Sequence, residues 1–307
     1  MRPNFSPEGI PGGWTQARAA LRAAALVGVT AGAALLQLFA IRLRLPLARC
    51  LPRAWHRICC RLLTMDVRCY GMPETAGPVL YVCNHASYLD VTVLGGLIDG
   101  RFVAKAEVAR WPVIGALGAL QGTIFIERRP QGARNHSDAL RRALHAGGSL
   151  ILFPEGTSND GNRVLPFKSA LFAAADTVVG GTEVIVQPVT IAYSRHKGLP
   201  MGRRLRPYFA WYGDMTLVGH LWDCLGIGGA GIDVIFHDAV RSSQFVSRKE
   251  LARHCQSRVA FGLSDALSGR MPYRPAADPA ADLRPVLGQL ALPIWPNSAV
   301  LETGREL

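Results

Sequence analysis

A histidine and an aspartate five positions apart could together remove a proton from a hydroxyl group. The segment YVCNHASYLD places His85 and Asp90 after a short apolar run, and Ser87 with Asp90 forms an S-x-x-D pattern that can open a helix. A histidine before such a cap can fold back toward a carboxylate on the first helical turn. The carboxylate would accept the imidazole Nδ1 proton and leave Nε2 to act as a general base. The alternative is that Asp90 is only a helix cap.

Two neighbouring arginines follow a second apolar run. The segment GTIFIERR, from Gly122 to Arg129, ends in Glu127, Arg128 and Arg129. At the carboxyl end of a strand, where open α/β sheets present ligand sites, a guanidinium group could bind a phosphate or a carboxylate through two hydrogen bonds. The alternative is an exposed strand end with solvated charges.

A third segment, residues 152–172, runs from an apolar strand through the letters PEGT into a loop rich in Gly, Asn and Asp. A helix is expected to begin near Lys168, and the backbone N–H groups at a helix start can bind an anion. Arg163 could add positive charge, and a plain surface loop is the alternative. The P-loop, G-x-S-x-G and H-E-x-x-H patterns are absent, which argues against a P-loop protein, a serine hydrolase and a zinc protease.

The elements that must position these segments follow an α/β pattern. After Asp66, short apolar runs alternate with helix-like stretches. The expected strands are 79–83, 101–104, 123–127, 149–153, 183–193, 207–212 and 232–237. The expected helices are 87–98, 111–120, 132–146, 168–177, 215–225 and 248–263. The prediction is an α/β fold: one mixed-sheet domain flanked by helices.

The amino-terminal part predicts a membrane anchor. Residues 23–41 carry no charged side chain and are long enough, as a helix, to cross most of a bilayer's apolar core of about 30 Å. The run exceeds the apolar region of a cleaved signal peptide, about 7 to 15 residues, so we expect it to be retained. Two insertion modes stay open, across the bilayer or into one leaflet.

A basic segment follows the apolar run. Residues 42–65 contain no acidic residue, and four of their arginines are spaced by four, which predicts a stripe along one helix face: Arg49, Arg53, Arg57 and Arg61. Pro52 would start or kink this helix, leaving 53–65 as an amphipathic segment on anionic headgroups. The positive-inside rule then predicts the cytoplasmic face of the inner (plasma) membrane. The alternative is a solvated basic face beside a core helix.

The charge and the cysteine content of the chain indicate which classes of binding partner to expect. The 307 residues carry a net charge of +12, from 34 Lys and Arg against 22 Asp and Glu, which favours an anionic membrane or nucleic acid. Because the densest basic run adjoins the apolar run, and no recognised nucleic-acid motif is present, we predict no nucleic-acid binding. Seven scattered cysteines without paired CxxC spacing are typical of reduced thiols and not of a zinc site.

The three segments, followed by VIVQPVTIAY, resemble the four ordered motifs of the glycerolipid acyltransferase family, which makes phosphatidic acid from lysophosphatidic acid. NHASYLD is similar to the H-x-x-x-x-D block, GTIFIERR to G-x-x-F-I-x-R, FPEGTS to F-P-E-G-T, and the Pro188 region to the last block. The resemblance spans 79–193. Family members are also similar in having a basic, membrane-associated amino-terminal segment.

The resemblance implies a lysophospholipid O-acyltransferase. An acyl chain would pass from an acyl-carrier-protein or coenzyme A thioester to the free hydroxyl of 1-acyl-sn-glycerol-3-phosphate. His85 would be the general base and Asp90 its partner, with an oxyanion held by backbone N–H groups, no acyl-enzyme, no cofactor and no metal. The implied partners are membrane lipids, the lysolipid acceptor and the acyl donor. The implied substrate-binding residues are Arg128, Glu155, Gly156, Thr157, Arg163 and Lys168.

One departure from the family pattern bears on the acceptor. The family often has Arg after F-P-E-G-T, whereas this chain has Ser158, followed by Asn159 and Asp160. This loop, together with WYGDM at 211–215, also resembles the bacterial lyso-ornithine lipid acyltransferases, whose acceptor carries an amino-acid head. Because Arg163 can compensate for the missing charge, we expect the glycerol phosphate acceptor ahead of the ornithine one. A non-catalytic membrane adaptor with the same fold is the third interpretation.

The expected domain organisation follows from these assignments. We expect an amino-terminal tail at 1–22, membrane-associated hydrophobic and basic amphipathic helices at 23–65, and the acyltransferase domain at 66–270. Residues 271–307 are rich in Pro, Ala and Asp, which predicts a poorly ordered tail.

Overall fold

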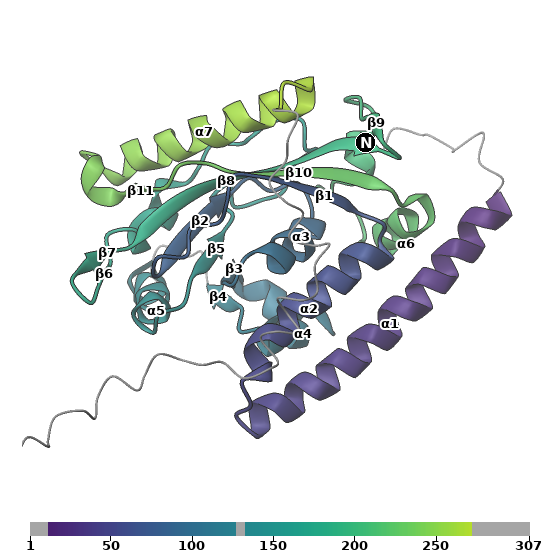
Figure 1. The fold of residues 1–307 in the computed structure, drawn as a ribbon, viewed down its shortest axis with the longest axis horizontal. Helices are drawn as coiled ribbons and strands as arrows, with labels where there is room; N and C mark the ends of the chain where they lie inside the picture. Colours follow the sequence, from purple (N-terminus) through teal and green to yellow (C-terminus); the bar gives the residue numbers. More distant parts are fainter. Residues whose placement is uncertain (1–11, 127–132, 272–307) are drawn as a thin grey trace, which may run out of the picture.

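The apolar runs of the sequence pair into one mixed sheet with helices on both faces (Figure 1), so the predicted fold class is confirmed. The computed structural model describes residues 12–126 and 133–271. The strand order is β1-β10-β8-β2-β5-β3-β4, with β9 and β11 paired to β8. The strands are β1 (Asp66–Tyr70), β2 (Val79–Cys83), β3 (Arg101–Lys105), β4 (Ile124–Ile126), β5 (Leu150–Leu152), β8 (Ile185–His196), β9 (Leu199–Pro200), β10 (Ala230–Phe236) and β11 (Val240–Arg241).

Strand β2 lies in the middle of the sheet and is buried on both faces. It pairs in parallel with β5 on one side and with β8 on the other. Val79, Tyr81 and Cys83 join one hydrophobic cluster, whereas Leu80 and Val82 join the other. A strand covered on both faces is apolar throughout, which is why VLYVC lacks a polar alternation. The carboxyl end of β2 therefore delivers the following loop to the edge of a rigid core.

The helices divide between the two faces. One face is covered by α2, α3 and α6, and the other by α5 and α7. The α-helices are α1 (Gly12–Arg42), α2 (Leu47–Leu62), α3 (Leu89–Leu97), α4 (Ile114–Leu120), α5 (Ala133–His145), α6 (Leu217–Ile227) and α7 (Arg248–Ser268). Short 3-10 turns are η1 (Ala106–Arg110), η3 (Ser169–Ala174), η4 (Arg206–Tyr208) and η5 (Ser242–Gln244), and β6 (Val178–Val179) pairs with β7 (Thr182–Glu183).

Two predicted elements are wrong in type, and the sequence did not predict β1 or the two-residue strands β6, β9 and β11. Residues 207–212 are not a strand: the 3-10 turn η4 ends at Tyr208, and Phe209 and Ala210 pack into the core without a strand partner. Residues 168–177 contain the 3-10 helix η3 in place of an α-helix. Strand β1 pairs in parallel with β10, although its short sequence, DVRCY, was not predicted as a strand.

The predicted anchor is a single long helix, α1, which lies beside α2 at one side of the molecule (Figure 1). The helical stretch Thr15–Arg42 is long and apolar enough to cross a membrane, and only 11% of its most apolar 18 residues are buried in the protein. Large apolar side chains such as Leu21, Val27 and Leu35 are exposed. This surface supports membrane association.

Two of the four arginines of the predicted basic stripe pack against the protein, and the other two, Arg49 and Arg61, are exposed. Arg57 is buried, and its Nε donates to the Gly96 carbonyl oxygen in α3 at 2.7 Å. Arg53 forms an ion pair with Asp99 at 2.5 Å. Half of the stripe therefore faces the protein, because α2 packs against α3 on that side. Pro52 lies inside α2 and does not start it.

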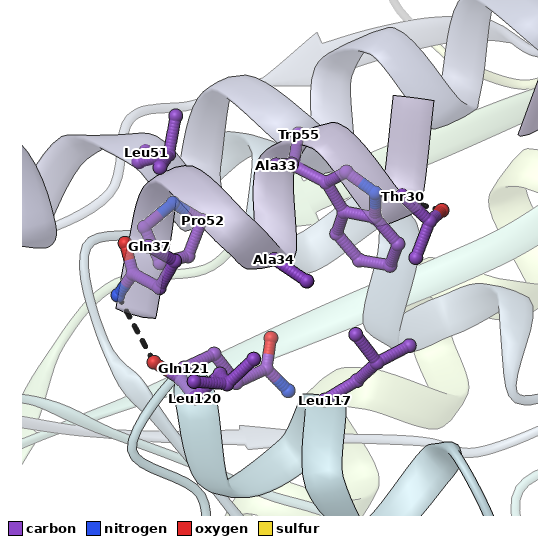
Figure 2. A pocket seen from close by; sticks show the side chains of 10 residues that line it. All are labelled: Thr30, Ala33, Ala34, Gln37, Leu51, Pro52, Trp55, Leu117, Leu120 and Gln121. Atoms are coloured by element: carbon purple, nitrogen blue, oxygen red, sulfur yellow. Dashed lines mark hydrogen bonds between the residues drawn. The ribbon is translucent and has the colours of Figure 1, made fainter. Parts of the chain in front are cut away.

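A small cavity of about 40 Å³ lies between α1, α2 and α4 (Figure 2). At its edge, the buried Gln37 of α1 donates to the carbonyl oxygens of Ala48 and Leu120, each at 3.0 Å. Because Pro52 has no N–H, the Ala48 carbonyl lacks its usual partner within α2. Gln37 supplies that partner and joins α1 to the other two helices.

Candidate active site

The loop between β2 and α3 brings His85 and Asp90 together as the sequence predicted. His85 Nδ1 lies 2.9 Å from Asp90 Oδ2. The same carboxylate oxygen accepts the backbone N–H groups of Ala86 and Ser87, at 2.8 and 2.9 Å. Asp90 Oδ1 accepts the hydroxyl of Tyr193 at 2.7 Å. Asp90 is fully buried and lies in the first turn of α3, where the helix dipole favours a negative charge.

The imidazole of His85 is fixed in orientation but remains accessible. Its side chain is 21% exposed, and its ring stacks on Phe153 with the ring centroids 4.1 Å apart and an angle of 21°. With Nδ1 directed at Asp90, no hydrogen bond within residues 12–126 and 133–271 occupies Nε2. The geometry therefore has what a general base needs: an oriented ring with one free nitrogen.

Glu155 is buried directly behind the loop between β2 and α3, which we call the candidate catalytic loop. Its Oε1 accepts the backbone N–H of His85 at 3.0 Å, and its Oε2 accepts Asn159 Nδ2 at 2.7 Å. Burial raises the pKa of Glu155 to about 7, although the hydrogen bonds oppose this rise. Both oxygens are held by donors of the protein itself. This arrangement indicates that Glu155 positions the loop, and its contact with an acceptor stays a prediction.

The other residues of the third motif lie around the same turn. Gly156 is buried with φ +78°, a conformation that favours glycine, and its N–H donates to the Phe153 carbonyl oxygen at 3.1 Å. Thr157, Arg163 and Lys168 are exposed. No hydrogen bond or ion pair between these three side chains and His85 is present in the described structure. Their roles in substrate binding stay predictions, and Arg128 lies outside the described residues, as do Glu127 and Arg129.

Two buried polar residues that sequence reasoning missed join the candidate catalytic loop to β8. Asn84 exchanges two hydrogen bonds with the backbone of Ile191, each at 2.9 Å. Tyr193, two residues further along β8, holds Asp90 as described above. A polar residue next to a candidate catalytic histidine was the available signal for Asn84. Tyr193 gave no comparable signal, since it lies inside an apolar run.

A third missed residue, Arg206, fixes the loop that follows the third motif. Its guanidinium is buried and donates to the carbonyl oxygens of Tyr193 and Met201, at 2.9 and 2.7 Å. It also donates to the side-chain oxygen of Asn162. Arg206 therefore connects the Asn/Asp loop to the strand that supports Asp90.

The seven cysteines are free thiols. Burial raises the pKa of the Cys59 and Cys60 thiols to about 12. Within the described ranges, no three His, Cys, Asp or Glu side chains are grouped to hold a metal ion.

Several known proteins are similar to this chain in sequence. A family model described as "Acyltransferase" matches residues 66–192. The lyso-ornithine lipid O-acyltransferase of Rhizobium meliloti (strain 1021) is 41% identical over 248 residues, covering 80% of this chain and 85% of that protein. That of Brucella abortus (strain 2308) is 41% identical over 80% of this chain and 94% of that protein.

Two further comparisons concern the phosphate-type relatives. The 1-acyl-sn-glycerol-3-phosphate acyltransferase of Neisseria gonorrhoeae is 33% identical over 63% of this chain and 72% of that protein. The crystal structure of the 1-acyl-sn-glycerophosphate (LPA) acyltransferase PlsC from Thermotoga maritima has a TM-score of 0.52 and 23% identity, covering 72% of this chain and 79% of that one, which shows the shared fold. The chain therefore belongs to the acyltransferase family that includes the lyso-ornithine lipid and 1-acyl-sn-glycerol-3-phosphate acyltransferases.

Proposed function

We propose that this protein transfers a fatty acyl chain from a thioester donor to the free hydroxyl of a lyso-ornithine lipid. The observation that carries this proposal is the 41% identity to two lyso-ornithine lipid O-acyltransferases over 80% of the chain. The phosphate-type relative from Neisseria is 33% identical over 63% of the chain. This comparison favours the second of the two expected acceptors, so the ranking that rested on Arg163 is reversed.

The geometry of the site supports direct acyl transfer. In the proposed mechanism, His85 Nε2 removes the hydroxyl proton of the acceptor while Asp90 holds Nδ1 and stabilises the imidazolium that forms. The hydroxyl oxygen attacks the thioester carbonyl carbon, the carbon–sulfur bond then breaks, and the leaving thiolate takes the proton back from His85. Backbone N–H groups would stabilise the oxyanion.

The acceptor and the product are lipids, and α1 supplies the surface that meets them. We infer that the protein works at the cytoplasmic face of the inner membrane, because exposed basic residues such as Arg42, Arg44 and Arg49 follow the apolar helix. The donor would be a thioester of acyl-carrier protein or coenzyme A.

A competition assay tests the acceptor. The purified full chain, in mixed micelles, receives equal amounts of lyso-ornithine lipid and lysophosphatidic acid with one acyl thioester. We expect ornithine lipid as the main product. Preferential formation of phosphatidic acid would reverse the assignment of the acceptor.

A substitution tests the catalytic role in the same assay. His85→Ala should lower turnover by at least about a hundredfold, because general-base catalysis typically contributes 10²- to 10⁴-fold. His145→Ala is the matched control, since His145 is exposed at the end of α5. Unchanged turnover in His85→Ala would favour the non-catalytic adaptor.

A further inference from the structure

The two sequence features that depart from the phosphate-type pattern touch each other beside His85. Ser158 stands where the family often has Arg, and its hydroxyl donates to the carbonyl oxygen of Trp211, the first residue of the WYGDM segment. The Trp211 N–H donates in turn to the carbonyl oxygen of Ala86 at 2.8 Å. Ala86 follows His85 directly. Ser158 and Trp211 are therefore one structural unit, held against the candidate catalytic loop.

The indole of Trp211 packs against the rings of Tyr88 and Trp111, which come from two other segments. Tyr88 lies 6.0 Å from it between ring centroids, at 73°, and Trp111 lies 5.9 Å away, at 80°. The indole N–H of Trp211 donates to the Met215 carbonyl oxygen at 2.9 Å, which fixes the ring. Trp111 is 38% exposed, and Trp211 and Tyr88 are half-buried. We call these three residues the aromatic wall.

The chemistry of the two acceptors differs at one group that an aromatic surface can distinguish. An ornithine head carries a primary ammonium, whereas a glycerol phosphate carries only negative charge. The face of an aromatic ring attracts a cation through its quadrupole, and Trp is the strongest of the aromatic side chains in this respect. An arginine at position 158 would place a competing cation beside the wall, whereas a serine is neutral.

We propose that the aromatic wall of Tyr88, Trp111 and Trp211 binds the ammonium group of the acceptor headgroup, and that Ser158 holds Trp211 in place for this purpose. This inference rests on the proposed function, because it assumes an acceptor with an amino-acid head. It adds a headgroup subsite to the His85 site and gives the serine after the third motif a defined structural role.

The ammonium itself can be changed to test the subsite. The experiment compares kcat/KM of the full-length protein for lyso-ornithine lipid and for the same lipid acetylated on its side-chain nitrogen, which removes the positive charge. We expect the wild type to prefer the charged lipid by about threefold to thirtyfold, the range of a cation–π contact. Trp211→Leu and Trp111→Leu should each reduce that preference, whereas Trp211→Phe should retain most of it.

Substitutions of Ser158 and of a tryptophan outside the aromatic wall complete the experiment. Ser158→Ala, which lacks the donor to Trp211, should reduce the preference, and Ser158→Thr should keep it. Trp222→Leu is the matched control, because Trp222 is also 38% exposed but lies on α6 and donates to Gln16 of α1. Its preference should equal that of the wild type.

The outcomes separate this inference from the proposed function. If the wild type acylates the charged and acetylated lipids equally well, or if Trp211→Leu and Trp111→Leu both keep the full preference, the aromatic subsite is refuted while the function stands. If the wild type acylates lysophosphatidic acid but acylates neither lyso-ornithine lipid nor its acetylated form, the proposed function fails, and the subsite fails with it.

Discussion

Among the described residues, the Asp90 carboxylate accepts four hydrogen bonds, and one of them comes from outside the candidate catalytic loop. That donor is Tyr193, whose pKa is raised by burial and by the nearby Asp90 charge, so its hydroxyl keeps its proton. Both carboxylate oxygens are therefore held by hydrogen bonds, three at Oδ2 and one at Oδ1. The ring of His85 takes its orientation from that carboxylate, so Tyr193 is a positioning residue for the proposed base.

Tyr193→Phe tests this positioning role. The variant leaves Asp90 Oδ1 buried without its donor, which typically costs about 1.5 to 3 kcal/mol for a charged acceptor. We expect kcat to fall by about tenfold to a hundredfold while KM changes by less than about twofold, because Tyr193 is buried away from the substrates. Tyr70→Phe in β1 is the control. A variant with wild-type kcat would show that Asp90 does not need this hydrogen bond.

The pKa of Glu155 gives a prediction about stability and pH. Burial raises it from 4.5 in the unfolded chain to about 7 in the folded protein. Between these values the folded state holds a proton that the unfolded state has released, so rising pH favours unfolding. The contribution of Glu155 to stability is therefore largest below about pH 4.5, falls by on the order of 3 kcal/mol up to about pH 7, and is constant above it.

Glu155→Gln, which cannot ionise, isolates that contribution. The free energy of unfolding of each protein is measured by urea titration in detergent micelles from pH 4.5 to 8. We expect the wild type to lose stability relative to Glu155→Gln as pH rises toward 7, and the two curves to run parallel above it. Parallel curves over the whole range would mean that Glu155 is ionised in the folded protein.

The sequence was sufficient to predict site residues whose partners lie close to them along the chain. His85 and Asp90 are five positions apart, and the S-x-x-D pattern predicted the loop that joins them. Tyr193 and Asn84 could not be found in this way, because their partners lie more than 100 positions away along the chain. Glu155 was predicted as a site residue, but the direction of its side chain depends on the loop that folds behind it.

At the scale of elements, two glycines in α3 allow α2 to approach closely. A Cβ placed on Gly95 would lie 2.4 Å from the ring of His56, and one on Gly96 would lie 3.2 Å from the Arg57 side chain. His56 cannot move away cheaply, because its ring is buried and its Nε2 is paired with Gln121 at 2.8 Å. Since α3 also carries Asp90, the contact between α2 and α3 supports the site.

Gly95→Ala tests this contact. We expect a loss of about 1 to 3 kcal/mol in the free energy of unfolding, the usual cost of overpacking a core, with lower acyl transfer because α3 is displaced. Gly28→Ala in α1 is the control: nothing lies within 4 Å of its added Cβ, and alanine favours the helix more than glycine does. A neutral effect of Gly95→Ala would show that the helices can separate without cost.

Element types were predictable where a local pattern decides them. The apolar run VLYVC and the helix that follows it were located from the sequence alone. The run at 207–212 looked like a strand because it is apolar, yet it fills the core beside η4. The arginine spacing in α2 was recognised correctly, but periodicity cannot tell whether the stripe meets a membrane or a neighbouring helix such as α3.

Over the molecule as a whole, α1 distributes its side chains in the opposite way to an amphipathic helix of a soluble protein. Its inner face consists mostly of small residues and Gln37, while its large apolar side chains point outward. Polar contacts with the domain occur along its length: Gln16 with Trp222, Arg22 with the Leu225 carbonyl, Thr30 with Trp55, and Gln37 with Ala48 and Leu120. Composition predicted an anchor, but only these contacts show how it is attached.

These contacts favour one of the two insertion modes that the sequence left open. A helix attached to the domain near positions 16, 22, 30 and 37 cannot also stand across a bilayer without leaving the domain. We therefore expect α1 to lie in one leaflet with its outward side chains among the acyl chains.

Cysteine labelling tests this expectation. The measurement uses Arg18→Cys and Arg42→Cys, one at each end of α1, in a Cys50→Ser background. The proteins are reconstituted in sealed vesicles and treated with an impermeant maleimide. Both positions should react from the side that carries the domain, whereas reaction from opposite sides would establish a transmembrane helix.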